Sequence, residues 1–169
     1  MENEKWQREQ AAEQPDRETA HRCVDILIRT MERCFHSESS LTVRALARAL
    51  SEKYHIAHDV CLTAVWGSWA RFVYRDCLPR FVDFAAEVME VPPEPTPEQM
   101  AVAGIEALEA FFKSLDLPTN IPSLGILPTD TELLELAHQC ALSAGGVDGE
   151  KTLTEEDVYR VYKMANSAR

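Results

Sequence analysis

Residues 104–126 read GIEALEAFFKSLDLPTNIPSLGI, and this stretch decides the fold of the chain. Ahead of its prolines, apolar side chains recur at steps of three and four residues, which is the spacing of one helix face. Thr96-Pro97-Glu98, just upstream, is typical of a helix start, since proline suits the first turn and threonine can cap it. We therefore predict a helix from about residue 97 to 115 and an ordered loop over 117–128. The apolar positions of this helix are Ile105, Leu108, Phe111, Phe112 and Leu115.

The same periodicity predicts further helices on both sides of this stretch. Upstream they are expected over about 16–35, from a serine loop at 37–40 to about 54, over about 58–72, and from Leu78-Pro79 to about 88. Downstream they run from about 133 to Gly145-Gly146, and from a capping box of Thr154 and Asp157 to Ala165. Trp66, Trp69, Phe72 and Tyr74 are expected in the core or at a former domain interface.

No segment of useful length alternates as a half-buried strand does, so the predicted fold class is all-α. Residues 16–169 are expected to form a single helical bundle domain of about seven helices, counted from the periodic segments above. Residues 1–15 are expected to be a polar N-terminal tail. Residues 91–97, with four of the nine prolines, are expected to form a stiff, extended connector.

Charge and cysteine usage narrow the class of protein. The net charge of −11, from 28 acidic and 17 basic residues, repels phosphate backbones and anionic lipid, so we expect no nucleic-acid or membrane partner. Residues 1–17 are polar and charged, so we expect no secretory signal there, and no run approaches the ~18 apolar residues of a membrane helix. Five cysteines without a Cys-x-x-Cys pair indicate reduced thiols, and we predict a cytoplasmic protein.

The stretch 104–126 resembles the late segment of group III, butanol dehydrogenase-like, iron-containing alcohol dehydrogenases. In that family a helix ending in Phe-Phe runs into a Leu-Pro-Thr turn. Residues 153–165, LTEEDVYRVYKMA, are similar to the family's closing helix, and residues 58–91 are similar to a helix pair that begins with a metal-binding histidine. The resemblance covers most of residues 16–166 and implies the C-terminal helical domain of the dehydroquinate synthase-like fold.

The resemblance also implies what the family's chemistry requires. Its enzymes use NAD(P), bound by an N-terminal domain, and iron or zinc, held by one aspartate and three histidines. No Gly-rich phosphate turn follows a strand in this sequence, so we predict no cofactor-binding residue and a truncated domain. The aspartate and the first histidine belong to a family helix that precedes the matched segment, and we expect both to be absent.

The remaining two ligands and a neighbouring active-site histidine lie in a His-x3-His-x9-His pattern in the family. The matching positions here are Arg44 at a ligand position, Arg48 at the active-site histidine position, and His58 at the last ligand position. A guanidinium stays protonated and offers no lone pair, so Arg44 cannot bind a metal. His58 is therefore the only ligand position retained, and we predict no catalytic residue and no cofactor or metal for this chain alone. Asp59 and Gly67 also depart from the family, which has a small residue and a proline there.

Three functional hypotheses stay open. The chain is a non-catalytic remnant or pseudoenzyme that meets a protein partner, or itself, through the former nucleotide-domain face. Alternatively, it is the helical subunit of a split NAD(P)-dependent alcohol dehydrogenase, an oxidoreductase whose nucleotide-binding domain is a separate chain. Third, it is an adaptor in which Arg44 and Arg48, one helical turn apart, bind a carboxylate or phosphate. A new metal site of His55, His58 and Asp59 is a further alternative. Activity of the chain alone is not expected.

Overall fold

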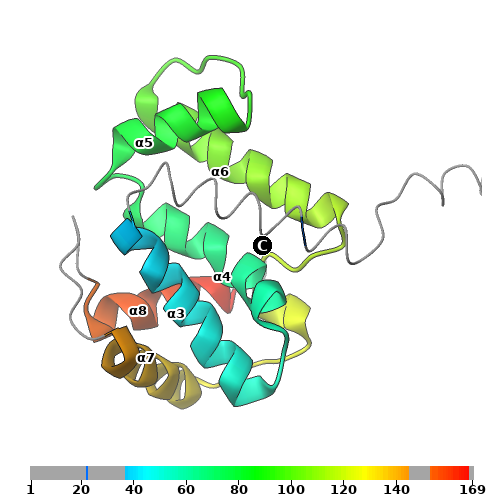
Figure 1. The fold of residues 1–169 in the computed structure, drawn as a ribbon, viewed down its shortest axis with the longest axis vertical. Coiled ribbons are helices and arrows are strands. Elements are labelled where there is room, and N and C mark those ends of the chain that lie inside the picture. The colour runs from blue at the N-terminus through cyan, green and yellow to red at the C-terminus, as the bar shows by residue number, and fades with distance from the viewer. Residues whose placement is uncertain (1–21, 23–36, 145–152, 168–169) are drawn as a thin grey trace, which may run out of the picture.

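The computed structural model describes residue 22, residues 37–144 and residues 153–167, and within these ranges it is helical and contains no strand. The α-helices are α3 (Ser37–Tyr54), α4 (His58–Val73), α5 (Leu78–Asp83), α6 (Pro97–Ser114), α7 (Asp130–Ala144) and α8 (Glu155–Ala165) (Figure 1). A π-helix, η1 (Phe84–Val88), continues α5, and a 3-10 turn, η2 (Pro122–Leu124), precedes α7. The all-α prediction is confirmed. The predicted tail, the predicted helix over 16–35 apart from residue 22, and Gly145-Gly146 lie outside the described residues.

Helix α4 lies at the centre of the bundle. It packs against α3, α6, α8 and η2, and every residue from Cys61 to Ala70 is buried. A helix that is apolar on all sides is typical of a core position, because no face is left for solvent. The ring centroid of Trp66 lies 6.1 Å from that of Phe84 and 6.3 Å from that of Phe112, so α4 contacts η1 and α6 through aromatic side chains.

The other helices form two groups on either side of α4 (Figure 1). Helices α3, α7 and α8 pack together on one side, and α5, η1 and α6 on the other. The backbones of α6 and η1 approach closely, since a Cβ atom placed on Gly104 would lie 2.5 Å from the Cβ of Ala85. A glycine is therefore required at this contact. The predicted core aromatics Trp66, Trp69 and Tyr74 are buried, and Phe72 is half-buried against the core.

Two predicted helix starts are confirmed in detail. At α6, the Thr96 hydroxyl accepts the N–H of Gln99 at 3.2 Å, and Pro97 occupies the first turn. At α8, Thr154 and Asp157 form the full capping box, in which each side chain accepts the backbone N–H of the other residue. The start of α3 differs from the prediction, because residues 37–40 are its first turn and not a loop. Serine is tolerated there, since first-turn N–H groups have no partner within the helix.

Residues 117–128 form the ordered loop predicted from the sequence. The Ile121 side chain is buried, and its N–H donates to the carbonyl oxygen of Ala165 at 2.8 Å. The Asn166 side chain donates to the carbonyl oxygen of Pro128 at 3.1 Å. The loop is therefore fixed to the C-terminal end of α8.

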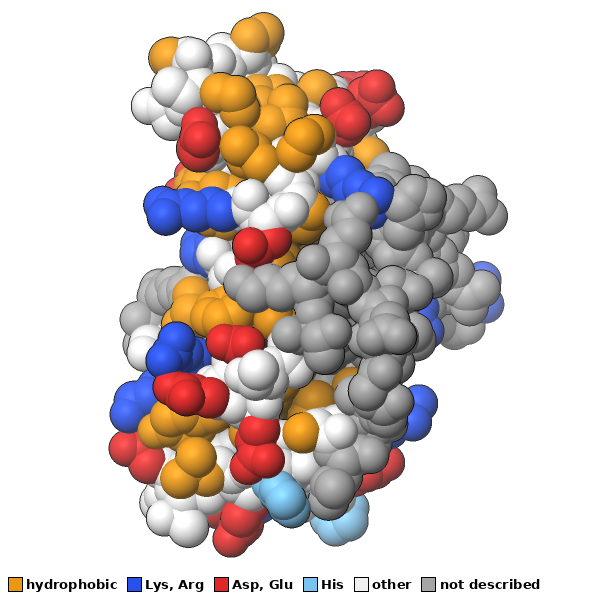
Figure 2. Space-filling model, turned by 90° about the vertical axis from the view of Figure 1, so that its left-hand side faces the viewer, with side chains coloured by type: hydrophobic (Ala, Val, Ile, Leu, Met, Phe, Trp, Pro, Cys, Tyr) orange, Lys and Arg blue, Asp and Glu red, His pale blue; other side chains and the backbone are white. Residues whose placement is uncertain are grey.

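The segment 91–96 contains no regular structure, and residues Pro92 to Pro97 are exposed. Figure 2 shows apolar side chains gathered at the end of the molecule that α5, η1 and this connector form, with both charge signs mixed elsewhere on that face. Within the described ranges, no helix has the length and apolar character needed to cross a membrane.

Candidate functional site

The turn between α3 and α4 places the residues that the sequence singled out. Helices α3 and α4 pack against each other and are joined by residues 55–57. Ser51 near the end of α3 donates to the carbonyl oxygen of Ile56 at 2.7 Å. His55 is exposed and adopts a left-handed φ of 54°, which ends α3 and reverses the chain. The first turn of α4 is thereby held next to the C-terminal half of α3.

Arg44, Arg48 and His58 come together at this helix pair. Arg44 is half-buried and Arg48 exposed, one turn apart on α3, and His58 is the first residue of α4. Although His58 is an exposed residue, partial burial of its imidazole lowers its pKa, and the charges of Arg44 and then Arg48 lower it further. All three predicted positions therefore lie in one electrostatic neighbourhood.

The donor set of this neighbourhood does not fit iron or zinc. Two of its three groups are guanidinium ions, and His58 supplies a single imidazole lone pair, whereas such metals take three or four protein ligands. No group of three or more His, Cys, Asp or Glu side chains suited to a metal occurs in the parts of the chain that are described. His55, His58 and Asp59 accordingly do not form the alternative site. The Asp59 carboxylate instead accepts the N–H of Val60 at 3.0 Å.

Two turns further along α4, Gly67 marks a contact that the sequence analysis missed. Arg71 donates to both carboxylate oxygens of Glu109 on α6, at 2.7 and 2.6 Å, and also to the carbonyl oxygen of Gly67 at 3.2 Å. A Cβ atom on Gly67 would overlap the Glu109 carboxylate. The missing side chain thus makes room for a largely buried ion pair, with 22% and 13% of the two side chains exposed. Arg71 and Glu109 are 38 residues apart, so no local pattern reveals the pair.

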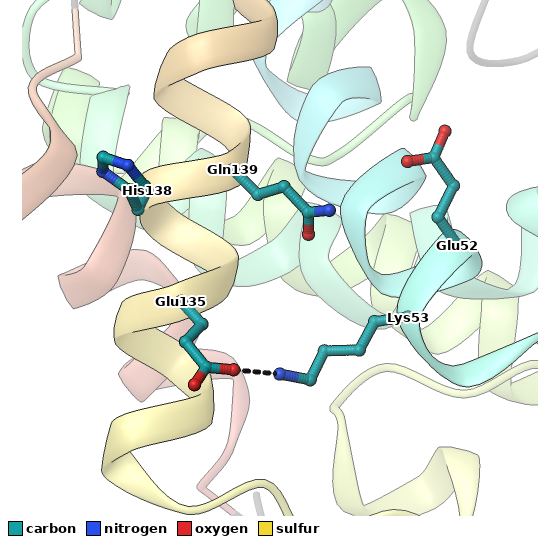
Figure 3. Close-up of a pocket in the computed structure, with 5 residues that line it drawn as sticks. All are labelled: Glu52, Lys53, Glu135, His138 and Gln139. Carbon is teal, nitrogen blue, oxygen red and sulfur yellow. Dashed lines mark hydrogen bonds and ion pairs between the residues drawn. The ribbon is translucent and has the colours of Figure 1, made fainter.

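A hollow of about 420 Å³ lies between α3 and α7 (Figure 3) and is lined by Glu52, Lys53, Glu135, His138 and Gln139. An ion pair of 2.7 Å between Lys53 and Glu135 crosses it, and this hydrogen bond raises the pKa of Lys53. His138 on α7 pairs with Glu155 at 3.1 Å. None of the site positions predicted from the sequence lies in the hollow. The Lys53–Glu135 pair joins α3 to α7, and the His138–Glu155 pair joins α7 to α8.

Of the three cysteines that the structure describes, two are buried in the core. Burial raises the pKa of Cys61 and of Cys140 to about 11, so both thiols stay protonated and unreactive at neutral pH. Cys77 is half-buried, and all three are free thiols. Cys23 and Cys34 lie outside the described residues. The described cysteines therefore behave as small apolar side chains.

Comparison with known proteins agrees with the fold. The family described as Fe-containing alcohol dehydrogenase family, C-terminal, matches residues 19–166. NADH-dependent butanol dehydrogenase A of Clostridium acetobutylicum is 28% identical over 118 residues, which are 69% of this chain and 30% of that protein. Probable NADH-dependent butanol dehydrogenase 1 of Bacillus subtilis is 29% identical over 121 residues, 71% of this chain and 30% of its own length.

Solved structures show the same similarity. The crystal structure of NADH-dependent butanol dehydrogenase A from Thermotoga maritima has a TM-score of 0.66 and 25% identity, and the match covers 75% of this chain and 33% of that one. An aldehyde reductase of E. coli has the same fold over 73% of this chain and 32% of its own, with a TM-score of 0.65 and 19% identity. The chain therefore spans about a third of the length of the proteins that it matches.

Proposed function

Because the chain belongs to the iron-containing alcohol dehydrogenase family, through its C-terminal helical domain, we propose that it is a non-catalytic member whose metal site is degenerate. One observation carries this proposal. Arg44 and Arg48 stand at two of the family's three consecutive histidine positions, and their charges act on His58, the third.

The charge and the lone pairs of these side chains both oppose metal binding. Two guanidinium ions remain protonated at any accessible pH, so Arg44 puts positive charge at a ligand position of the family and Arg48 puts it at the neighbouring active-site position. A divalent cation near His58 would be repelled by both arginines, and a single imidazole cannot hold it against that repulsion. Without the Lewis acid, an alcohol or carbonyl oxygen is not polarised, and hydride transfer has no catalyst.

The proposal is tested by metal binding to the purified full chain. We expect iron and zinc contents far below one per chain, and no visible absorption of bound Co²⁺ on titration. An Arg44→His/Arg48→His variant places three imidazoles around the α3–α4 turn and is expected to bind Co²⁺ at least about tenfold more tightly. An Arg75→His/Arg160→His variant, which changes two exposed arginines elsewhere, is the matched control. Stoichiometric iron or zinc in the unmodified chain, with NADH-dependent reduction of butanal, would overturn the proposal.

We further propose that the domain acts by contacting another protein chain. Two observations support this proposal. In the family, the helical domain contacts a nucleotide-binding domain. In addition, two large apolar side chains are exposed within the described residues. These are Leu127, which is 81% exposed, and Leu134, which is 49% exposed. Light scattering coupled to size-exclusion chromatography tests self-association, and a Leu127→Ser/Leu134→Ser variant tests these side chains. A strictly monomeric chain that is unaffected by the double substitution would remove the self-association form of the proposal.

One observation favours the split-enzyme alternative. The chain keeps the fold of the helical domain, although the residues at the ligand positions differ. It requires a separate nucleotide-binding chain to supply the cofactor and the other metal ligands. Co-expression with the nucleotide-binding domain of the Clostridium acetobutylicum relative, followed by metal analysis and an assay of NADH oxidation with butanal, tests it. Turnover that exceeds that of either part alone, with one metal per complex, would favour this alternative over the non-catalytic proposal.

A further inference from the structure

We propose that the proline-rich connector, residues 91–97, is a docking segment for another protein. The partner that fits it is a domain that binds extended, proline-rich chains in a groove lined by aromatic side chains and rimmed by lysine and arginine. This assignment rests on the proposed contact with another protein chain, and it names a second surface and the kind of partner. The conformation, the exposure and the charge of the connector support it.

The sequence of the connector restricts its backbone at every position before α6. Residues 91–97 read VPPEPTP, so each residue from Val91 to Thr96 is either a proline or the residue directly before one. Proline fixes φ at about −65°, and a residue before proline is confined to extended conformations. Thr96, with φ −127° and ψ 153°, is extended. The segment therefore favours polyproline II, in which Pro92 and Pro95 lie one turn apart, at about three residues per turn.

Both ends of the connector are fixed to the helices. Glu90 has a left-handed φ of 52°, which turns the chain out of η1. The N–H of Val91 then donates to the carbonyl oxygen of Ala85 at 2.9 Å. At the other end, the Thr96 hydroxyl caps α6 by accepting the N–H of Gln99. The segment is thus ordered before it binds, so docking costs less conformational entropy than docking of a free chain.

The proline rings of the connector are exposed although they are apolar. Every residue from Pro92 to Pro97 is exposed, and Val88, Met89 and Val91, just before them in the chain, are half-buried. Figure 2 shows the apolar side chains at this end of the molecule with acidic side chains beside them. An exposed apolar patch with a polar rim is typical of a protein interaction site.

The position of α6 does not depend on the prolines. The backbone of Gly104 on α6 packs against Ala85 of η1, and the ion pair of Arg71 and Glu109 joins α6 to α4. Helix α6 is therefore held by its own contacts with both neighbours. The exposed prolines are available for a contact outside the bundle.

The charge of the connector selects the kind of groove. Glu90 and Glu94 are exposed along it, and the whole chain carries a net charge of −11. A groove rimmed by carboxylates would be repelled, whereas a rim of lysine and arginine is attracted to both acids. SH3, WW and EVH1 domains bind polyproline II segments in aromatic-lined grooves. The partner that fits is a domain of this class with a basic rim.

Isothermal titration calorimetry tests the proposal with the full chain and purified SH3, WW and EVH1 domains, chosen in pairs with basic-rimmed and acidic-rimmed grooves. We expect saturable one-to-one binding to at least one basic-rimmed domain, and weaker binding or none to its acidic-rimmed counterpart. A synthetic polyproline peptide should compete with the chain, because both occupy the aromatic groove. Added salt should weaken the binding, since Glu90 and Glu94 contribute through their charge.

Pro92→Ala/Pro95→Ala removes two proline rings one turn apart and should weaken the binding by about tenfold or more. Glu94→Lys reverses an exposed charge and should weaken the binding while reducing its salt dependence. Pro79→Ala is the control, because it removes an exposed proline from the first turn of α5, and it should bind as the unmodified chain does. Thermal unfolding checks that each variant is folded, and Glu94→Lys serves if the double variant is not.

Three outcomes would contradict this docking segment. They are the absence of saturable binding to every domain tested, undiminished binding by the double proline variant, and a preference for acidic-rimmed grooves. Light scattering of the Leu127→Ser/Leu134→Ser variant and the metal measurements concern other parts of the surface. A failure of the docking segment is therefore distinguishable from a failure of the proposed function.

Discussion

The hydroxyl of Tyr162 on α8 donates a hydrogen bond to the backbone carbonyl oxygen of Leu46 on α3, at 2.7 Å, in the interior of the protein. The two residues are 116 positions apart, and both side chains are fully buried. The bond joins the closing helix to the helix that carries Arg44 and Arg48. It therefore helps to hold α3 in place, although neither Tyr162 nor Leu46 belongs to the candidate site.

Tyr162→Phe should remove this bond while preserving the packing of the ring. We expect a loss of about 1 kcal/mol in the free energy of unfolding, because the Leu46 carbonyl keeps its bond within α3. Urea denaturation followed by circular dichroism measures it. Tyr159→Phe, on the half-buried part of the same helix, is the control and should change the stability by less. A Tyr162→Phe variant as stable as the unmodified chain would show that the bond makes no net contribution.

Stability should decline in alkaline solution. The pKa values of Cys61 and Cys140 are raised by burial from 9.0 to about 11, and that of Tyr162 is raised well above 10.0 for the same reason. Because folding favours the neutral form of all three, their contribution is complete below the unfolded pKa values. It is lost as the unfolded chain ionises, first through the thiols above pH 9 and then through Tyr162 above pH 10. The melting temperature at pH 8, 9, 10 and 11 checks this.

The same titration separates the contributions of the groups. Tyr162→Phe should flatten the decline above pH 10 only, and Cys61→Ala should flatten it from about pH 9. The slopes are compared and not the absolute melting temperatures, since each substitution also changes packing. A melting temperature that stays constant between pH 8 and 11 would contradict the linkage.

Glu109→Gln should destabilise the bundle more than the loss of a surface ion pair does. The substitution leaves the largely buried Arg71 with a neutral partner, and we expect a cost of about 1 to 2 kcal/mol. Glu156→Gln, which breaks the exposed pair of Glu156 and Arg160 on α8, is the matched control and should cost less than about 0.5 kcal/mol. Both are measured by urea denaturation. Equal effects of the two substitutions would show that burial gives the Arg71–Glu109 pair no advantage.

Gly104→Ala tests the close contact between α6 and η1. Alanine is a better helix former than glycine by about 1 kcal/mol, but the new methyl group would meet Ala85, and overpacking costs about 1 to 3 kcal/mol. We therefore expect a net loss of stability. Ala110→Gly on the exposed face of α6 measures the helix propensity alone, at a matched position of the same helix. If Gly104→Ala raised the free energy of unfolding by as much as Ala110→Gly lowered it, the new methyl group would be accommodated at this contact without a steric penalty.

Local signals predicted the parts of the fold that local physics determines. The stripe of Ile105, Leu108 and Phe112 is buried as its spacing indicated, and the Thr154–Asp157 capping box opens α8. The π-helix η1 was not predicted, because the residues over 84–88 read as a regular helix. Their backbone conformation coincides with the close approach of Gly104 on another helix, which no local pattern reveals.

The sequence predicted the positions of the candidate site but not the ion pair next to it. The positions of Arg44, Arg48 and His58 followed from the family resemblance, and the fold brings them together at the α3–α4 turn. The partner of Arg71 could not be predicted, since Glu109 is one of 28 acidic residues and lies on a separate helix. Which of many carboxylates an arginine meets is decided by helix packing and not by sequence spacing.

The space above Gly67 has a consequence for how this sequence can change over evolution. Its missing side chain is replaced by the Glu109 carboxylate, which Arg71 holds in place. A side chain at position 67 would require the carboxylate of Glu109 to move, because the two would overlap in the observed arrangement. We therefore expect substitutions at positions 67 and 109 to have non-additive effects on stability.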